Sequence, residues 1–224
     1  QSDATRGAEL ARQKSLWLKE LAPVARANVC PMRPERVVQE LNQFVDAKTL
    51  IVTDASYSTG WAMSQMEAPV AGRFMLSPRG TASIGWGLPA AIGAKLADPA
   101  RDVICVTGDG GFGYVINELE TAARYKVNLL VVVFNNATLG FQRHWEEKAL
   151  GRVMDCDFLD VDYSEVSRAL KGGGERVTDP QHLAAAFARG KKFPGPYVID
   201  AIIDPEAAAP IVGFDKPIVE GAYH

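Results

Sequence analysis

An alternation of strand-like and helical segments is the feature that most constrains how this chain folds. Residues 103–107 form a short apolar, β-branched run, as in strands buried on both faces of a sheet. A glycine-rich turn follows at 108–113, and residues 114–125 then carry apolar side chains at helical spacing. Residues 129–134 are a second buried strand-like run. The unit predicts two parallel strands joined by a helical crossover, with both following loops at the carboxyl edge of the sheet.

The same alternation continues over most of the chain. We therefore expect an α/β fold, a single domain with a doubly wound parallel sheet flanked by helices. Further strands are expected at 49–53, 74–76 and 197–203, and helices at 34–44, 88–96, 163–170 and 182–188. Flexible loop is expected at 171–174, and an irregular segment that closes over the site at 143–162. The domain is expected to span 33–204, between a helical lead-in at 1–32 and an extended arm at 205–224.

A carboxylate and a carboxamide end the two strands of the first unit. Asp109 lies in a Gly-Asp-Gly turn, and Asn135 and Asn136 follow the second strand after the 24 residues 111–134. Because the carboxyl ends of parallel strands share one edge, Asp109 and Asn136 are expected to converge. Mg²⁺ takes an octahedral shell of hard oxygen ligands, few from protein and the rest from phosphates and water. The pair predicts a magnesium ion that holds a diphosphate; the alternative is a tight turn and an asparagine cap that bind nothing.

The turn also has the glycine spacing of a dinucleotide-binding loop, through Gly108, Gly110 and Gly113. An uncompensated Asp109 would repel a bare pyrophosphate. The acidic residue that such loops need about 20 positions later, to bind a ribose hydroxyl, is also missing, because the next strand ends in two asparagines. No lysine of a Walker-type loop follows the glycines. A nicotinamide-binding domain is therefore the weaker alternative.

Three stretches resemble the thiamine-diphosphate enzymes, and within them the acetolactate synthase-like branch of decarboxylases and carboligases. They are the segment 80–93 (GTASIGWGLPAAIG), the Gly-Asp-Gly turn, and the segment 135–145 (NNATLGFQRHW). The similarity runs from about Arg33 to Ile203 and is to that family's C-terminal, diphosphate-binding domain. Full-length members also carry a pyrimidine-binding and a central domain. The resemblance implies thiamine diphosphate and Mg²⁺ as cofactors, and decarboxylation or carboligation of 2-oxo acids as the reaction.

The resemblance also implies roles for individual residues at the diphosphate end of the cofactor. Asp109, the Asn136 side chain and the Thr138 carbonyl would bind Mg²⁺. The backbone N–H groups of Gly110 and Gly111 would donate to the diphosphate. Two strand ends and the glycine turn would therefore form this part of the site.

At the reacting end, Ile84 corresponds to the bulky apolar residue that holds the cofactor bent, which brings the reacting atoms together. The Ala82 carbonyl would accept a hydrogen bond from the aminopyrimidine, and Gln142 and Trp145 would line the substrate pocket. The other expected cofactor contacts are Ser56, Tyr57 and Ser58, which replace the family's usual Gly-Gln-His, and Gly108, Leu139 and Gly140.

The resemblance implies that a further polypeptide completes the site. In the family, a glutamate from the pyrimidine-binding domain of a neighbouring subunit activates the aminopyrimidine. Glu118 and Glu120 follow the glycine turn and are expected to be helix-surface or packing groups. We therefore expect a homo- or hetero-oligomer, a partner that carries the pyrimidine-binding domain, and no turnover by this chain alone. Gln1 in place of methionine favours a processed or excised part of a longer chain.

Composition excludes several classes of partner. The 27 acidic and 24 basic residues nearly balance and do not cluster, so neither nucleic acid nor an anionic membrane is expected. No stretch approaches the roughly 20 apolar residues that span a bilayer. The three cysteines are scattered, which favours a reducing cytoplasm.

Two alternatives to an acetolactate synthase-like function stay open. One lies within the enzymes: part of a 2-hydroxyacyl-CoA lyase or an oxalyl-CoA decarboxylase-type enzyme, with an acyl-CoA as substrate. The other is a non-catalytic scaffold or regulatory subunit that keeps the fold without binding cofactor. The Asp109–Asn136 pair argues against the scaffold.

Overall fold

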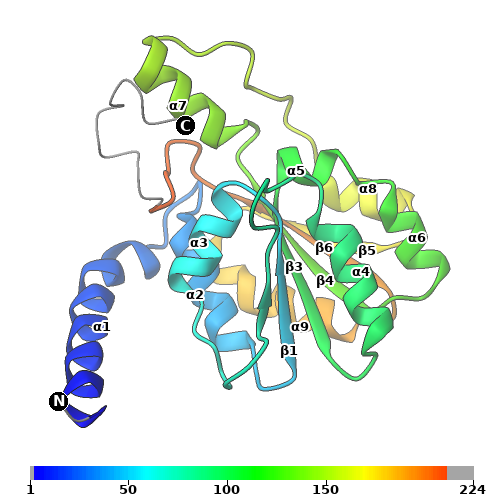
Figure 1. Ribbon diagram of the computed structural model, residues 1–224. Helices are drawn as coiled ribbons and strands as arrows, with labels where there is room; N and C mark the ends of the chain where they lie inside the picture. Colours follow the sequence, from blue (N-terminus) through cyan, green and yellow to red (C-terminus); the bar gives the residue numbers. More distant parts are fainter. Residues whose placement is uncertain (1–2, 211–224) are drawn as a thin grey trace.

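Six parallel strands lie between two layers of helices in the computed structural model, which describes residues 3–210 (Figure 1). The strand order is β2-β1-β3-β4-β6-β5, and every neighbouring pair is parallel. The expected doubly wound α/β sheet is confirmed. The strands are β1 (Thr49–Thr53), β2 (Met75–Leu76), β3 (Asp102–Gly108), β4 (Leu129–Asn135), β5 (Gly173–Val177) and β6 (Pro196–Ile202).

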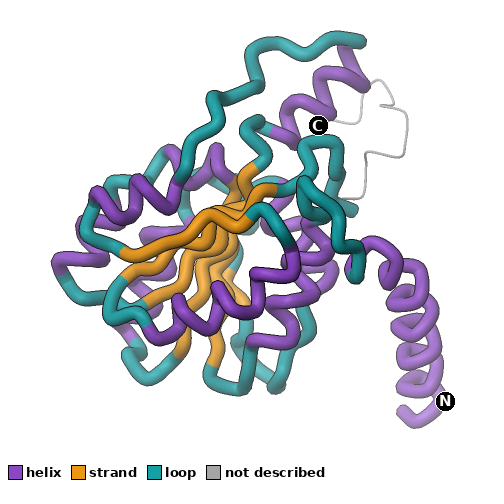
Figure 2. The backbone as a smooth tube through the Cα atoms, turned by 180° about the vertical axis from the view of Figure 1, so that it is seen from behind, coloured by secondary structure: helices purple, strands orange, loops and turns teal. Residues whose placement is uncertain are grey.

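Helices cover both faces of the sheet, as Figure 2 shows from behind. One face packs against α2 (Pro34–Phe44), α3 (Tyr57–Gln65) and α9 (Leu183–Lys192). The other packs against α4 (Gly87–Ala97), α5 (Asp109–Gly113), α6 (Glu118–Arg124) and α8 (Tyr163–Ala169). Two helices lie outside these layers: α1 (Asp3–Ala25) extends away from the domain, and α7 (Gly140–Leu150) stands beyond the carboxyl edge of the sheet (Figure 1).

Strand β4 contributes side chains to two hydrophobic cores, one on each face of the sheet. Every residue of this strand is buried, and successive side chains point to opposite faces. Phe134 packs in the same cluster as Trp61 of α3, whereas Val133 belongs to the cluster that contains Leu119 of α6. Because β4 is buried on both faces, its sequence is an unbroken run of apolar residues up to Phe134.

The predicted helix at 114–125 is shorter than expected. A short α5 begins at Asp109, a turn follows at 114–117, and α6 begins at Glu118. The apolar spacing included Tyr125, yet this side chain is 60% exposed. Periodicity counts such residues as core positions although they face solvent.

The segment 143–162 is only partly irregular, so that prediction was wrong for its first half. Helix α7 continues to Leu150, because Glu146, Glu147 and Lys148 are good helix formers. The helix ends where Gly151 adopts a left-handed conformation (φ 66°). Helix α3 was also not predicted. An η1 turn (Pro180–His182) precedes α9, which runs past the predicted end.

The second half of the predicted loop at 171–174 instead begins the edge strand β5, which pairs with β6. Its glycines are required by close packing. A Cβ atom at Gly173 would lie 2.6 Å from Tyr197 Cδ2, and one at Gly174 would lie 2.8 Å from the Val198 carbonyl oxygen. Glycine therefore marks close approach here rather than flexibility.

The C-terminal arm predicted from 205 onward is described only as far as Pro210, and the rest lies outside the described residues. Within 3–210, no helix combines the length and apolar content needed to cross a membrane.

Two helical glycines give a matched test of this packing. A Cβ at Gly190 would lie 2.5 Å from Leu130 Cδ1, whereas Gly93 has no atom within 4 Å. We expect Gly190→Ala to lower the free energy of unfolding by about 1–3 kcal/mol through overpacking. Gly93→Ala should raise it by up to about 1 kcal/mol through helix propensity. Urea unfolding measures both, and equal shifts of the same sign would contradict the packing.

Candidate cofactor-binding site

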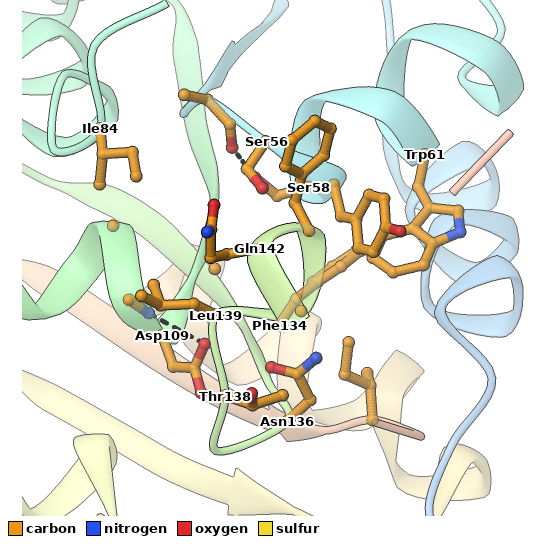
Figure 3. A pocket seen from close by; sticks show the side chains of 18 of the residues that line it. Ser56, Ser58, Trp61, Ile84, Asp109, Phe134, Asn136, Thr138, Leu139 and Gln142 are labelled. Carbon is orange, nitrogen blue, oxygen red and sulfur yellow. Dashed lines mark hydrogen bonds between the residues drawn. The ribbon is translucent and has the colours of Figure 1, made fainter. Parts of the chain in front are cut away.

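A cavity of about 530 Å³ opens at the carboxyl ends of β1, β3 and β4, and is called the edge cavity below. Its volume lies in the range of small-molecule sites. It brings together residues from four separate segments, in agreement with the convergence expected of parallel strand ends (Figure 3). The sequence-predicted residues that line it are Ser56, Tyr57, Ser58, Ala82, Ile84, Gly108, Asp109, Gly110, Gly111, Asn136, Thr138, Leu139, Gly140 and Gln142.

Asp109 has the electrostatic character of a cation ligand. Its side chain is buried, with 3% of its surface exposed. One oxygen, Oδ1, accepts a hydrogen bond from the Gly110 N–H at 2.9 Å, whereas the buried Oδ2 has no hydrogen-bond partner among the described residues. Burial raises the pKa of this carboxyl to about 6, and nearby backbone N–H groups only partly oppose the rise. A buried oxygen of this kind is unfavourable unless a positive group meets it.

The two asparagines at the end of β4 have different roles. Asn135 is buried, and its amide donates to Asp200 Oδ1 at 2.9 Å while its oxygen accepts from the Ala137 N–H at 3.2 Å. Asn136 makes no side-chain hydrogen bond with residues 3–210, and its amide faces the edge cavity beside Thr138 (Figure 3). Asn135 therefore holds the turn, and Asn136 is left to bind a ligand.

The turn after Asn136 presents the expected third donor. Ala137 has a left-handed backbone (φ 54°), and the Thr138 hydroxyl donates to the Cys156 carbonyl at 3.1 Å. The Thr138 carbonyl accepts from the Gly140 N–H at 2.9 Å, and a carbonyl oxygen has a second lone pair. One carboxylate, one amide and one carbonyl are the hard oxygen donors that Mg²⁺ prefers. Accordingly, no group of three or more His, Cys, Asp or Glu side chains forms a metal cluster within 3–210.

Asp54, at the end of β1, is the main residue of the site that the sequence did not reveal. It is 1% exposed, and its carboxylate accepts from the Gly85 N–H at 3.0 Å and the Gly87 N–H at 3.1 Å. It thereby anchors the loop that carries Ala82 and Ile84. An acidic residue directly after a strand is a weak signal on its own, because its partners lie more than 30 positions away.

The loop before α4 presents an apolar side chain to the cavity. Ala82 has a left-handed backbone (φ 54°), as does Gly85 (φ 83°). Ile84 is 45% exposed although it is large and apolar, and it lies across the edge cavity from Asn136 (Figure 3). Such exposure is what a wedge against a bound ligand requires.

Tyr57 closes the cavity on the α3 side. Its hydroxyl lies 3.0 Å from His144 Nδ1 of α7, and its ring meets Phe141 edge-on at 5.6 Å between centroids. Burial raises the pKa of Tyr57 to about 12, so the phenol is protonated at neutral pH. Ser58 donates to the Ala55 carbonyl at 3.0 Å, while Ser56 is exposed with a left-handed backbone (φ 72°).

Helix α7 supplies only one of its two predicted pocket residues to the edge cavity. Gln142 lines the edge cavity and donates from its amide to Glu146 Oε1 at 2.7 Å. Trp145 is not among the residues that line the edge cavity, and its place in a substrate pocket stays a prediction. Three residues along a helix carry it about 4.5 Å farther along an axis that leads away from the strands.

Comparison with known proteins agrees with a cofactor-binding site at this edge of the sheet. Residues 54–201 match the family model described as thiamine pyrophosphate enzyme, C-terminal TPP binding domain. The chain is 32% identical over 201 residues to a probable acetolactate synthase large subunit of Methanococcus aeolicus. The aligned region makes up 87% of this chain and 33% of the relative.

Two bacterial relatives give the same picture. The putative thiamine pyrophosphate-containing protein YdaP of Bacillus subtilis is 31% identical over 87% of this chain and 34% of its own length. The acetolactate synthase large subunit IlvG of Mycobacterium tuberculosis is 34% identical over 80% of this chain and 33% of its own. The chain thus spans about a third of the length of these curated relatives.

The raised pKa of Asp109 predicts a pH-dependent stability in the absence of metal. The Asp109 carboxyl keeps its proton up to about pH 6 in the folded chain, whereas an unfolded aspartate releases it near pH 3.9. The protonated carboxyl therefore contributes to the free energy of unfolding below pH 4, and this contribution is lost as the pH rises through 6. We expect the unfolding free energy of the wild type, relative to Asp109→Asn, to fall by roughly 2 kcal/mol between pH 4 and 7. Urea unfolding at both pH values measures it.

Glu147→Gln is the control, because this exposed glutamate makes no side-chain ion pair or hydrogen bond with residues 3–210. A wild-type advantage over Asp109→Asn that stays constant with pH would mean that Asp109 is not desolvated.

Proposed function

Because this chain belongs to the thiamine pyrophosphate enzymes as their C-terminal, cofactor-binding domain, we propose that its edge cavity binds thiamine diphosphate through Mg²⁺. We further propose that it is the cofactor-binding part of an acetolactate synthase-like enzyme of 2-oxo acids. One observation carries the proposal: a buried carboxylate oxygen of Asp109, without a hydrogen-bond partner in 3–210, lies beside Asn136 at the sheet edge.

The residues present fit a metal–diphosphate group. Asp109 Oδ2, the Asn136 amide oxygen and the Thr138 carbonyl would bind Mg²⁺, leaving the other positions to phosphate oxygens and water. Gly110 and Gly111 line the cavity, and their backbone N–H groups would donate to the diphosphate. The ion would also compensate the desolvated charge of Asp109, which the protein alone does not.

The other wall of the cavity is suited to hold the reacting end. When bound, thiamine diphosphate supplies a thiazolium carbon nucleophile and an electron sink for cleaving or forming a bond beside a carbonyl. Ile84 would press against the cofactor from its anchored loop, and the Ala82 carbonyl would accept a hydrogen bond from it. Gln142 and the protonated Tyr57 would orient substrate polar groups.

A glutamate from elsewhere is needed to complete this site. Asp109 is the only acidic residue among the described residues that line the edge cavity, and it is assigned to the metal. We therefore propose that a pyrimidine-binding domain, on another polypeptide or another copy, supplies the activating glutamate, and that the enzyme is an oligomer. The three free cysteines within 3–210 fit a reducing cytoplasm.

Calorimetric titration of thiamine diphosphate tests the proposal directly. We expect Mg²⁺-dependent binding to the wild type. Asp109→Asn should weaken it by about 10- to 100-fold, because one charged ligand is lost. EDTA should have the same effect on the wild type.

Glu147→Gln, which removes an exposed carboxylate from α7, is the matched control and should bind as the wild type does. Asp109→Asn should stay folded, since it removes a desolvated acid. Equal affinity of Asp109→Asn and the wild type, or binding that is indifferent to Mg²⁺, would refute the assignment of the metal site.

A second prediction concerns turnover. We expect the 224-residue chain with thiamine diphosphate and Mg²⁺ to consume no pyruvate, because the described cavity wall contains no glutamate. Pyruvate should be consumed once a polypeptide with the pyrimidine-binding domain is added. Coupled assay of pyruvate measures both, and clear consumption by the chain alone would defeat the prediction.

A further inference from the structure

Arg79 is a cation at the edge cavity that the proposed cofactor site does not use. It lies in the loop between β2 and α4, five residues before Ile84, and is the only basic residue among the described residues that line the cavity. Its guanidinium makes no ion pair or hydrogen bond with residues 3–210, whereas Arg33 and Arg143 are each paired with two carboxylates. Arg79 therefore faces the cavity with its donors available.

The position of Arg79 is defined by the loop around it. Its backbone N–H donates to the Ser77 carbonyl at 2.9 Å, and Gly80 continues the turn with a left-handed backbone (φ 88°). The end of the loop is fixed by the buried Asp54 carboxylate, which binds the N–H groups of Gly85 and Gly87. A long side chain on an anchored loop can reach a ligand while its base stays in place.

The surroundings of Arg79 favour an anionic ligand. Much of the cavity wall is apolar or aromatic, including Trp61, Phe134 and Phe141, so the exposed Arg79 is the one cationic group that the described lining offers to an anion. A guanidinium offers a planar set of donors that matches carboxylate and phosphate oxygens. The diphosphate itself is assigned to Asp109 and Asn136, and Ile84 of the Arg79 loop lies across the cavity from Asn136 (Figure 3).

We propose that Arg79 binds an anionic group of the substrate that the reaction retains; this rests on the proposed function. A carboxylate that is about to leave as CO₂ must give up its charge, so pairing it with arginine would stabilise the reactant more than the transition state. The suitable groups are the carboxylate of an acceptor 2-oxo acid and the phosphates of a coenzyme A thioester. Arg79 thus determines which substrates enter.

Direct binding to the full chain, loaded with Mg²⁺ and thiamine diphosphate, tests this role without turnover. Lactate is the carboxylate probe, because it carries a hydroxyl in place of the 2-oxo group that the cofactor would attack, and its methyl ester is the neutral analogue. Free coenzyme A is the phosphate probe. The variants are Arg79→Gln, Arg79→Lys and, as a control, Arg73→Gln, which changes an exposed arginine outside the cavity.

We expect Arg79→Gln to weaken binding of the anion that the wild type prefers by about ten-fold, with Arg79→Lys intermediate. Arg73→Gln should bind the anion as the wild type does. The affinity for the methyl ester should be the same in the wild type and in Arg79→Gln. A preference for lactate identifies a carboxylate substrate, and a preference for coenzyme A identifies a thioester.

Three results would overturn the role of Arg79. The wild type binds neither anion, Arg79→Gln binds both as the wild type does, or Arg79→Gln loses affinity for thiamine diphosphate instead. Failure of the proposed function is distinct, because the wild type would then show no Mg²⁺-dependent cofactor binding before any anion is added.

Discussion

The buried carboxylate of Asp54 is the interaction on which the shape of the edge cavity depends. It accepts hydrogen bonds from the backbone of Ala55, Gly85 and Gly87, and so joins the end of β1 to the loop before α4. A Cβ at Gly87 or Gly111 would lie 3.1 Å from Asp54 atoms, so both glycines allow the backbone to approach this acid. The acid thus brings the loop and α5 together around one point.

A second buried carboxylate supports the opposite side. Asp200 of β6 is fully buried and accepts from Asn135 and from the Tyr163 N–H at 3.2 Å. Burial raises its pKa to about 6, and the hydrogen bond from Asn135 opposes the rise. Because Asn135 also accepts from Ala137, the geometry of the turn after β4 depends on a strand two connections later. The ligand-bearing loops are therefore held from beneath by acids that never reach the ligand.

Sequence patterns predicted the parts of this site that depend on strand ends and glycine turns. Asp109 and Asn136 meet because parallel strands share a carboxyl edge, which is a rule of topology. Asp54 and Asp200 escaped prediction, since their roles depend on partners 31 to 65 positions away. Strand β5 and helix α7 were missed because glycine and charged residues were interpreted as loop, whereas close packing against Tyr197 and the capping turn at Gly151 decide the structure.

The desolvated Asp109 would link cation binding to the stability of this chain. Asp109 is held in a desolvated position without a compensating charge, which opposes folding once the group ionises. A cation that binds only the folded chain reverses that penalty, and its binding free energy adds to the stability of the fold. The Asp109 carboxylate would therefore determine both the desolvation penalty of the folded apoprotein and its affinity for a cation. A better hydrogen-bonded Asp109 would make a more stable apoprotein and a weaker metal ligand.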